Sequence, residues 1–424
     1  MRPELHAVII GGGITGAGIY RELRRAGLRT TLVEANKQLG SETTFNSSWL
    51  IHGGLRYLAY DPNMTAECCR DAGRIRDEFP QLLTRLPFLW PIYEGDKHGL
   101  ETVESLLEVY DGFSKDKGAR PHMRFNAEET LRIEPGLKAR GLRGALCFDE
   151  WLVDPRRLTA AVAAAATGGD GEILTGREVI GFVQESGRIG GVQLADGTTL
   201  RSRWVINASG PWTNRVAALA GLEIPMRLQK GVHLVYPGRL TRCAILAEAV
   251  DRKRHIFFIP SGDVTLLGPT DTPFDDDPGA AGAEEADVEY LDASMRRIFP
   301  ALPAQGLAPR TGVRPILGQS GPEFLLSRDF EVIDHELRDG VQGLVTVTGG
   351  KMTAFPSMAD AARRLLMYKL GESKAAAPER QRRKLLSIAA AGLGLGAAYL
   401  RHQMRGLAKR GAESTLEDFE TTYD

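Results

Sequence analysis

The sequence predicts an α/β fold of mixed α+β character, in which two domains are interleaved along the chain. The apolar run from Ala7 to Ile10 indicates a buried parallel strand, and it leads directly into glycines. Thr15 to Ala26 carries apolar residues one helical turn apart, and Thr30 to Val33 indicates a second strand. Strand, glycine turn, helix and strand in this order predict a Rossmann-like domain at the start of the chain.

Segments further along the chain predict a return to this sheet and a second, β-rich region. Pro155 to Ala166 is expected to be a helix and Trp204 to Ala208 a strand of the first sheet. A hairpin is expected around Ser261-Gly262-Asp263, in a β-rich region. Leu344 to Thr348 indicates one more strand, followed by a glycine turn and an amphipathic segment that ends at Leu370.

The region between these segments sets the expected domain boundaries. Asp61 to Glu150 is rich in charge and in helical spacing, with only Trp90 to Tyr93 read as a strand or turn. We expect a dinucleotide-binding domain from residues 1–60, 155–215 and 308–372, a β-rich substrate domain from residues 61–154 and 216–307, and a short C-terminal tail from residues 373–424.

Composition excludes several classes of protein. Of the 424 residues 43% are hydrophobic and 25% charged, which suits a large core and excludes a disordered chain. The 53 basic and 54 acidic residues leave a formal net charge of -1, so no overall attraction to nucleic acid is expected. The four cysteines lack metal-ligand spacing, so we expect no metal site and reduced thiols in the cytoplasm.

The glycine loop indicates the kind of ligand. Gly11, Gly13 and Gly16 satisfy the G-x-G-x-x-G pattern between the first strand and the first helix, where backbone N–H groups and the helix N-terminus bind a pyrophosphate. Glu34 ends the second strand, where a carboxylate accepts hydrogen bonds from adenosine ribose hydroxyls. A glutamate at this position favours an unphosphorylated ribose, and therefore FAD or NAD over NADP.

Several further motifs follow in a characteristic order. They are Ser47-Ser48-Trp49-Leu50-Ile51-His52-Gly53-Gly54-Leu55-Arg56-Tyr57-Leu58, Asn207-Ala208-Ser209-Gly210-Pro211-Trp212, Lys230-Gly231-Val232-His233, Phe258-Ile259-Pro260, Gly268-Pro269-Thr270-Asp271, Gly312-Val313-Arg314-Pro315, Ser327-Arg328-Asp329 and Gly349-Gly350-Lys351-Met352-Thr353. With the glycine loop, they make the chain resemble the FAD-dependent, quinone-linked glycerol-3-phosphate dehydrogenase family of the D-amino-acid-oxidase-like flavoproteins, over roughly residues 5 to 370.

The resemblance implies a cofactor site for FAD. Small residues let the backbone approach the planar flavin, and a helix N-terminus after Gly350 stabilises negative charge on it. The residues expected to bind the cofactor are Gly11, Gly13, Thr15, Gly16, Glu34, Ser47, Ser48, Gly53, Gly54, Ser209, Gly210, Gly349, Gly350, Met352 and Thr353.

The resemblance also implies catalytic and substrate-binding residues. His233 is the candidate general base, because a neutral imidazole can accept the proton of an alcohol. Arg314 and Lys351 are expected to act with it in catalysis, and Arg56 and Arg328 to bind substrate. Cations that converge on one pocket suit a dianionic phosphate. His52 is expected to have a packing or hydrogen-bonding role.

Two departures from the family pattern bear on the substrate. Where the family has Lys before Leu-Ile-His-Gly-Gly, this chain has Trp49, which we expect to narrow the pocket or to stack on a larger substrate. Ala354-Phe355-Pro356 replaces the common Thr-Tyr-Arg. The expected reaction is oxidation of sn-glycerol 3-phosphate to dihydroxyacetone phosphate with a quinone as acceptor. The alternatives are a related oxidase or dehydrogenase for another hydroxy acid, amine or phosphorylated alcohol, or a non-catalytic FAD-binding module at a membrane surface.

The tail carries an apolar segment between basic clusters. Leu385 to Leu400 is too short to span the ~30 Å hydrocarbon core as a helix, and Arg and Lys residues flank both of its ends. One hypothesis is therefore peripheral contact with the cytoplasmic face of a membrane, which would suit a lipid-soluble quinone. The other is a helix packed on the body of the protein.

Overall fold

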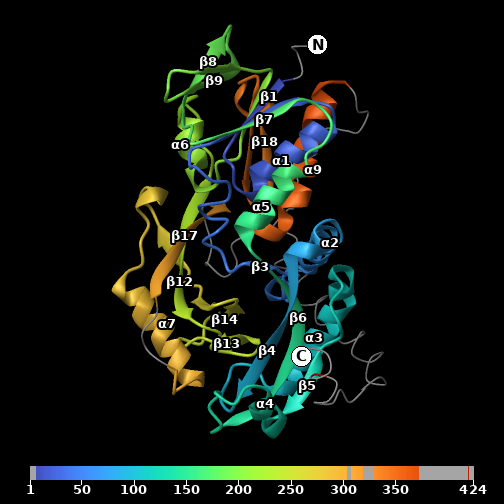
Figure 1. Ribbon diagram of the computed structural model, residues 1–424, viewed down its shortest axis with the longest axis vertical. Coiled ribbons are helices and arrows are strands. Elements are labelled where there is room, and N and C mark those ends of the chain that lie inside the picture. Colours follow the sequence, from blue (N-terminus) through green and yellow to red (C-terminus); the bar gives the residue numbers. More distant parts are fainter. Residues whose placement is uncertain (1–5, 303–306, 319–328, 372–418, 420–424) are drawn as a thin grey trace.

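The computed structural model describes residues 6–302, 307–318, 329–371 and Phe419. These residues form a six-stranded sheet, a ten-stranded sheet and a small three-stranded sheet. Figure 1 shows the six-stranded sheet in the upper half of the view and most of the ten-stranded sheet in the lower half. The predicted α/β fold of mixed character is confirmed.

The six-stranded sheet contains the predicted Rossmann-like unit. Its strands in spatial order are β18 (Phe330–Asp334), β19 (Leu344–Gly349), β11 (Trp204–Asn207), β1 (His6–Ile10), β2 (Arg29–Glu34) and β7 (Gly171–Thr175). Neighbouring strands are parallel except for β18, which is antiparallel to β19. Helix α1 (Ile14–Arg25) connects β1 to β2, so the carboxyl ends of the parallel strands meet at one edge.

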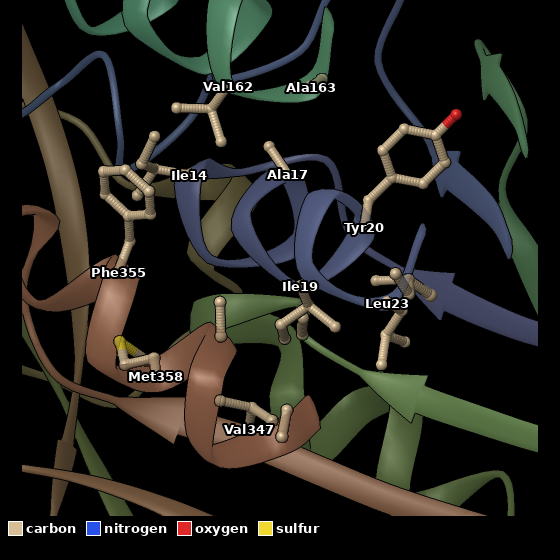
Figure 2. Packing of buried hydrophobic residues seen from close by; sticks show 14 of the residues in the cluster. Ile14, Ala17, Ile19, Tyr20, Leu23, Val162, Ala163, Val347, Phe355 and Met358 are labelled. Atoms are coloured by element: carbon tan, nitrogen blue, oxygen red, sulfur yellow. The ribbon is translucent and has the colours of Figure 1, made fainter. Parts of the chain in front are cut away.

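Three helices cover one face of this sheet. Helix α1 packs against α5 (Pro155–Ala164) and α9 (Phe355–Lys369), and Figure 2 shows this contact from close by. A side chain at Gly18 would place its Cβ 2.9 Å from the Phe355 ring, so glycine there allows α1 and α9 to approach closely. The residues labelled in this cluster are Ile14, Ala17, Ile19, Tyr20, Leu23, Val162, Ala163, Val347, Phe355 and Met358.

The opposite side carries the small sheet. It consists of β8 (Val179–Glu185), β9 (Arg188–Leu194) and β10 (Thr199–Arg201), and a turn at Asp196-Gly197 joins the last two. Apolar residues of β9 pack with those of β1 and β11 in one buried cluster. Two short helices, α6 (Thr213–Ala218) and α8 (His335–Asp339), complete this part.

The ten-stranded sheet is built largely from the second region of the chain. Its main path is β16 (Thr272–Phe274), β12 (Met226–Pro237), β15 (Val264–Gly268), β14 (His255–Ser261), β13 (Ala244–Glu248), β4 (Leu83–Tyr93), β6 (Leu142–Val153) and β3 (Leu50–Ile51), with β17 (Leu307–Leu317) paired to β12 and β5 (Met123–Asn126) paired to β6. The helices in this part are α2 (Pro62–Glu78), α3 (Leu100–Ser114), α4 (Ala127–Ile133) and α7 (Glu285–Ile298).

Two long strands lie largely within residues 61–150, where the sequence predicted mainly helix. The expected strand or turn at Trp90 to Tyr93 is the end of the 11-residue strand β4, which pairs antiparallel with the 12-residue strand β6. Pro87 and Pro91 are unusual inside a strand, because proline cannot donate to a sheet ladder. On the side facing β13, however, β4 pairs only through Phe88 and Leu89, so both prolines lie outside that register.

The two large sheets exchange chain segments. All of strand β17 after its first residue falls within the range that we assign to the dinucleotide-binding domain, yet the strand pairs with β12 of the ten-stranded sheet. Strand β3 likewise pairs with β6. The domain boundaries given above remain a proposal, and these two strands link the two halves of the protein through backbone hydrogen bonds.

Candidate active site

A cavity of about 1080 Å³ lies between the two large sheets. Residues at the carboxyl ends of parallel strands in the six-stranded sheet line it on one side, namely Ile10, Glu34, Ala208 and Gly349. Side chains of β4, β6, β13 and β14 line its other end from the ten-stranded sheet. The carboxyl edge of a parallel sheet is where α/β proteins bind their ligands.

The glycine loop forms the first part of the cavity wall. Gly11 has φ +105°, and a Cβ there would lie 2.6 Å from the Ala208 carbonyl oxygen. Only glycine therefore lets the loop leave β1 at this angle beside β11. Gly16 does not line the cavity, because it packs behind the loop, where a Cβ would lie 1.9 Å from the Gly11 oxygen.

Glu34 lies beside this loop as the sequence predicts. Its carboxylate accepts hydrogen bonds from the backbone N–H groups of Gly12 at 2.6 Å and Asn36 at 2.7 Å. Burial raises the pKa of this carboxyl, although the two N–H donors work in the opposite direction. The bare loop and the adjacent carboxylate fit the pyrophosphate and ribose of an adenine dinucleotide.

The turn at Gly349 and Gly350, at the end of β19, forms another part of the cavity wall. Gly349 and Gly350 both have positive φ, +80° and +74°, and the chain then turns into a 3-10 helix, Met352–Ala354, that continues as α9. The helix start thus faces the cavity, which suits a group that gains negative charge. The predicted cofactor residues that line the cavity are Gly11, Gly13, Thr15, Glu34, Ser47, Ser48, Gly54, Ser209, Gly210, Gly349, Gly350 and Met352.

Two further predicted cofactor residues lie behind the wall. A Cβ at Gly53 would lie 2.2 Å from the Tyr110 hydroxyl, so this glycine permits close packing against α3. Thr353 is buried, and its hydroxyl accepts a hydrogen bond from the His52 N–H at 3.1 Å. His52 has the expected hydrogen-bonding role, since its Nδ1 also accepts from the Gly54 N–H at 3.1 Å.

His233 lies on β12 and lines the cavity from the ten-stranded sheet. Its Nε2 lies 2.9 Å from the Ser48 hydroxyl oxygen, and only 2% of the residue is exposed. Burial, together with the charges of Arg314 and Arg310, lowers the pKa of His233 to about 3. The imidazole is therefore neutral near pH 7 and has a lone pair that can accept a proton.

Three predicted cations line the same cavity. Arg314 donates to the Asp271 carboxylate at 2.7 Å and to the Thr270 carbonyl at 3.1 Å. Arg56 and Lys351 both lie over the ring of Tyr57, at 5.5 and 4.5 Å from its centroid. Burial works against the charge of Lys351, but Tyr57 and Cys68 outweigh it and raise the pKa of the ammonium group. All three side chains are therefore charged where they meet the cavity.

Trp49 is a correction to the sequence-based expectation. It does not line the cavity. The residue has φ +58°, its indole N–H donates to the Phe45 carbonyl at 2.7 Å, and the Arg310 guanidinium lies 4.5 Å over its ring. The unusual backbone conformation turns the ring into the protein, so Trp49 neither narrows the pocket nor faces a substrate. Arg328 lies outside the described residues.

The structure also shows residues that sequence reasoning missed. Lys117 is fully buried and pairs with Glu150, which lines the cavity. Tyr110 donates to the same carboxylate at 2.7 Å, and the Gly53 N–H donates to it at 3.0 Å. No spacing in the sequence connects these residues, since they come from different elements. The basic run Lys253-Arg254-His255, which leads into β14, is visible in the sequence and could have indicated the site. All three residues line the cavity.

Comparison with known proteins identifies the family. The model of the FAD dependent oxidoreductases, the DAO family, matches residues 6–365. The chain belongs to this family. Its cofactor is FAD, in agreement with the glycine loop and the carboxylate of Glu34 described above.

Relatives and solved structures of this FAD dependent oxidoreductase include enzymes of glycerol phosphate oxidation. An aerobic glycerol-3-phosphate dehydrogenase of Staphylococcus saprophyticus is 32% identical over 372 residues, which are 84% of this chain and 66% of that protein. The structure of a glycerol-3-phosphate dehydrogenase from Bacillus halodurans in complex with FAD matches with a TM-score of 0.69 and 26% identity, over 87% of this chain and 66% of that one. An L-α-glycerophosphate oxidase from Mycoplasma pneumoniae, with FAD bound, shares the fold, with a TM-score of 0.67 and 21% identity over 85% and 94% of the two chains.

The chain spans about two thirds, 66%, of the curated relative from Staphylococcus saprophyticus. Among the described residues, no helix combines the length and the apolar character needed to cross a bilayer. The apolar segment from Leu385 to Leu400 lies outside the described residues.

Proposed function

We propose that this protein oxidises a phosphorylated secondary alcohol, with sn-glycerol 3-phosphate converted to dihydroxyacetone phosphate as the reference reaction and a quinone as the electron acceptor. One observation carries the proposal: a neutral buried histidine, His233, lines the same cavity as three cations and the residues predicted to bind FAD. The cations are Arg56, Arg314 and Lys351. The names of the relatives point to the same substrate.

The residues predicted to bind FAD would hold the cofactor in a defined position. The glycine loop and the N-terminus of α1 would bind the pyrophosphate, and Glu34 the adenosine ribose. Ser48, Gly54 and Gly350 would lie along the flavin, where small side chains leave room for a planar ring. When bound, FAD supplies the two-electron oxidant that takes a hydride from the carbinol carbon.

His233 takes the proton of the reacting alcohol at Nε2. This nitrogen already lies at hydrogen-bonding distance from a hydroxyl, that of Ser48, which marks where a hydroxyl donor can be accepted. In the free protein the charges of Arg314 and Arg310 help to lower the pKa of the imidazole. A dianionic substrate offsets those charges, so the pKa rises on binding and the histidine becomes a stronger base.

Arg56, Arg314 and Lys351 would bind the phosphate. Guanidinium groups bind phosphate oxygens in pairs, and an ammonium group adds a compact charge. The contact between Arg314 and Asp271 keeps the guanidinium in place before substrate binds. The three cations come from different elements, so the phosphate would also draw together the loop after β3, strand β17 and the turn before α9.

Electron transfer to a lipid-soluble quinone suits a protein that contacts a membrane at its surface. The support for a cytoplasmic protein in peripheral membrane contact is the basic and apolar pattern of residues 380–410. Phe419, near the end of the tail, packs its ring at right angles against Phe125, with 5.5 Å between the centroids. Co-sedimentation with anionic and with zwitterionic vesicles tests the contact, which should require the anionic lipid and weaken with salt.

Turnover with a dye acceptor tests the reaction. FAD-loaded protein should reduce the dye with sn-glycerol 3-phosphate and form one dihydroxyacetone phosphate for each two electrons. A soluble quinone should replace the dye, and hydrogen peroxide should stay at the background level. Absence of turnover with every alcohol phosphate would refute the proposed reaction, and rapid peroxide formation would replace the quinone by oxygen as the acceptor.

A further inference from the structure

We propose that the substrate oxidised at this site carries an apolar substituent, an alkyl chain or an aromatic ring, on the side of the carbinol carbon away from the phosphate. The site for this group is the end of the cavity lined by Phe88, Trp90, Leu106, Phe148, Leu246 and Phe257, which we call the aromatic chamber. The inference rests on the proposed oxidation of a phosphorylated alcohol and narrows its substrate class.

The aromatic chamber has a packed and well-defined wall. Phe88 stacks on Phe148 with 5.5 Å between the ring centroids, and Phe257 meets Phe88 edge-on at 5.9 Å. Phe88 and Phe148 are 2% and 5% exposed, so the little surface that they keep belongs to the cavity rather than to the outside of the protein. Aromatic pairs of this kind form a rigid apolar surface.

The aromatic chamber lies apart from the residues that hold FAD. Its side chains come from β4, β6, β13, β14 and α3, whereas the cavity-lining cofactor residues come from the six-stranded sheet, from its loops and from the segments on either side of β3. Figure 1 shows β4, β6, β13 and β14 together in the lower half of the molecule, away from α1. The chamber is therefore on the substrate side of the site.

Ionisable side chains also line the cavity beside the chamber, and three of them already have partners within the protein. Arg254 donates to the Asp271 carbonyl at 2.8 Å. The Glu150 carboxylate already accepts hydrogen bonds from Tyr110 and from the Gly53 N–H, and it pairs with Lys117. The His255 ring meets Trp90 edge-on at 5.0 Å, and burial, with the charge of nearby groups, lowers its pKa to about 4, so it is neutral near pH 7.

The terminal hydroxyl of glycerol 3-phosphate suits this wall poorly. Apart from the indole of Trp90, the side chains of the aromatic chamber offer no hydrogen-bonding group. A hydroxyl buried there gives up its bonds to water without replacement. An alkyl or phenyl group in the same position gains from burial, and each added methylene strengthens binding severalfold.

A substrate series tests the inference. The probes are sn-glycerol 3-phosphate, 2-hydroxypropyl phosphate, 2-hydroxyhexyl phosphate and 2-hydroxy-3-phenylpropyl phosphate, all assayed with FAD-loaded protein and the same dye. They share the phosphate and the secondary alcohol and differ in the third substituent. We expect kcat/KM to rise along the series, by about tenfold or more from glycerol 3-phosphate to the phenyl compound. Equal or lower values for the apolar probes would overturn the inference.

A pair of variants on α3 assigns any preference to the aromatic chamber. Leu106 and Val109 are both partly buried against the same apolar cluster, but only Leu106 lines the cavity. Leu106→Phe should lower kcat/KM for the phenyl probe by about tenfold relative to kcat/KM for glycerol 3-phosphate, whereas Val109→Phe should leave the ratio of the two as it is. Leu106→Ala should move the preference toward larger groups, and it provides the test if the phenylalanine variant loses FAD.

The outcomes separate the two proposals. If no alcohol phosphate is oxidised, the proposed function fails. If glycerol 3-phosphate is oxidised and the apolar probes are not, the function stands and the chamber inference fails. If Leu106→Phe raises the KM for a soluble quinone and leaves the substrate series unchanged, the chamber binds the acceptor, and the inference about the substrate is again overturned.

Discussion

Ser48 and His233 lie 2.9 Å apart, hydroxyl oxygen to Nε2, although they are 185 positions apart in the sequence. Ser48 is in the segment before β3 and His233 is on β12, at opposite parts of the ten-stranded sheet's path. The contact orients the imidazole of the proposed base before substrate arrives. It also couples the position of the cofactor-lining segment to that of the base.

Replacement of this hydroxyl should affect turnover more than cofactor binding. Ser48→Ala removes the contact that orients His233 until the alcohol of the substrate takes its place at Nε2, and we expect kcat/KM to fall by about tenfold, which corresponds to the loss of one hydrogen bond. His233→Ala should lower kcat by about 10²–10⁴-fold, the usual contribution of a general base. Steady-state kinetics and flavin absorbance measure both effects.

Ser47 provides the matched control. Its hydroxyl donates to the Thr44 carbonyl at 2.8 Å and lines the same cavity without contacting His233. Ser47→Ala should keep kcat/KM near the wild-type value. A Ser48→Ala variant as active as Ser47→Ala would mean that the hydroxyl contact has no part in catalysis.

Loss of a proposed phosphate-binding cation should weaken catalysis and not flavin binding. Arg314→Ala and Lys351→Ala each remove a charge-assisted contact, at a cost of about 1.5–3 kcal/mol, or about ten- to a hundredfold in kcat/KM. Arg314→Lys should recover only part of the loss, because lysine cannot bind phosphate oxygens in pairs. Full activity in both alanine variants would remove the argument for a phosphate site.

The glycine loop permits a test of the cofactor site alone. Gly11→Ala brings a Cβ to 2.6 Å from the Ala208 oxygen at φ +105°, so the loop must shift and FAD content should fall to a small fraction of wild type. Gly27 also has positive φ, +85°, but a Cβ added there would have no neighbour within 4 Å. Gly27→Ala should therefore cost stability by backbone strain alone and keep its FAD, as measured by absorbance after denaturation.

The buried pair of Lys117 and Glu150 should matter for stability. Lys117 is fully buried and also donates to the Tyr110 hydroxyl at 2.9 Å. Lys117→Met leaves the Glu150 carboxylate buried with a lost partner, and we expect the free energy of unfolding to fall by about 3–5 kcal/mol. The double variant Lys117→Met with Glu150→Gln should recover part of this loss in a denaturation experiment. A double variant less stable than the single one would contradict this account of the pair.

Local patterns in the sequence predict the part of the fold that binds the dinucleotide. Strand β1, the glycine loop, helix α1 and strand β2 lie within one residue or two of their expected positions, because each is encoded by neighbouring residues. Local patterns do not predict strands β4 and β6 in full, because both are largely buried on both faces and show no regular alternation of polar and apolar residues.

The site shows the same division. The residues inside glycine-containing motifs mostly line the cavity, because such motifs mark close backbone approach. The orientation of Trp49 depends on a positive φ, which the sequence does not reveal for a tryptophan. The partnership of Lys117 with Glu150 and the walls of the aromatic chamber depend on how distant strands pair, so only the tertiary structure shows them.

Acid should destabilise the protein through its buried histidines. The pKa values of His52 and His233 are about 3 and that of His255 about 4, chiefly because burial disfavours the charged form. In the unfolded chain a histidine titrates near 6.5, so below that pH the unfolded state binds more protons and stability falls as pH falls. The stabilisation is complete above about pH 6.5 and is lost as the pH approaches 3 to 4.

The size of the effect can be measured by chemical denaturation between pH 7.5 and 5. Each histidine should contribute on the order of 1.4 kcal/mol per pH unit below about pH 6. Asp71 opposes this, because burial raises its pKa to about 6 and the folded state then binds the extra proton. Burial also raises the pKa values of Glu34 and Glu134, but it lowers those of His6 and His335 in addition to the three histidines above. The histidines outnumber the carboxyls, so the net free energy of unfolding should decrease on acidification. His255→Phe should flatten the pH dependence. A slope unchanged in His255→Phe would show that this histidine can take up a proton without unfolding.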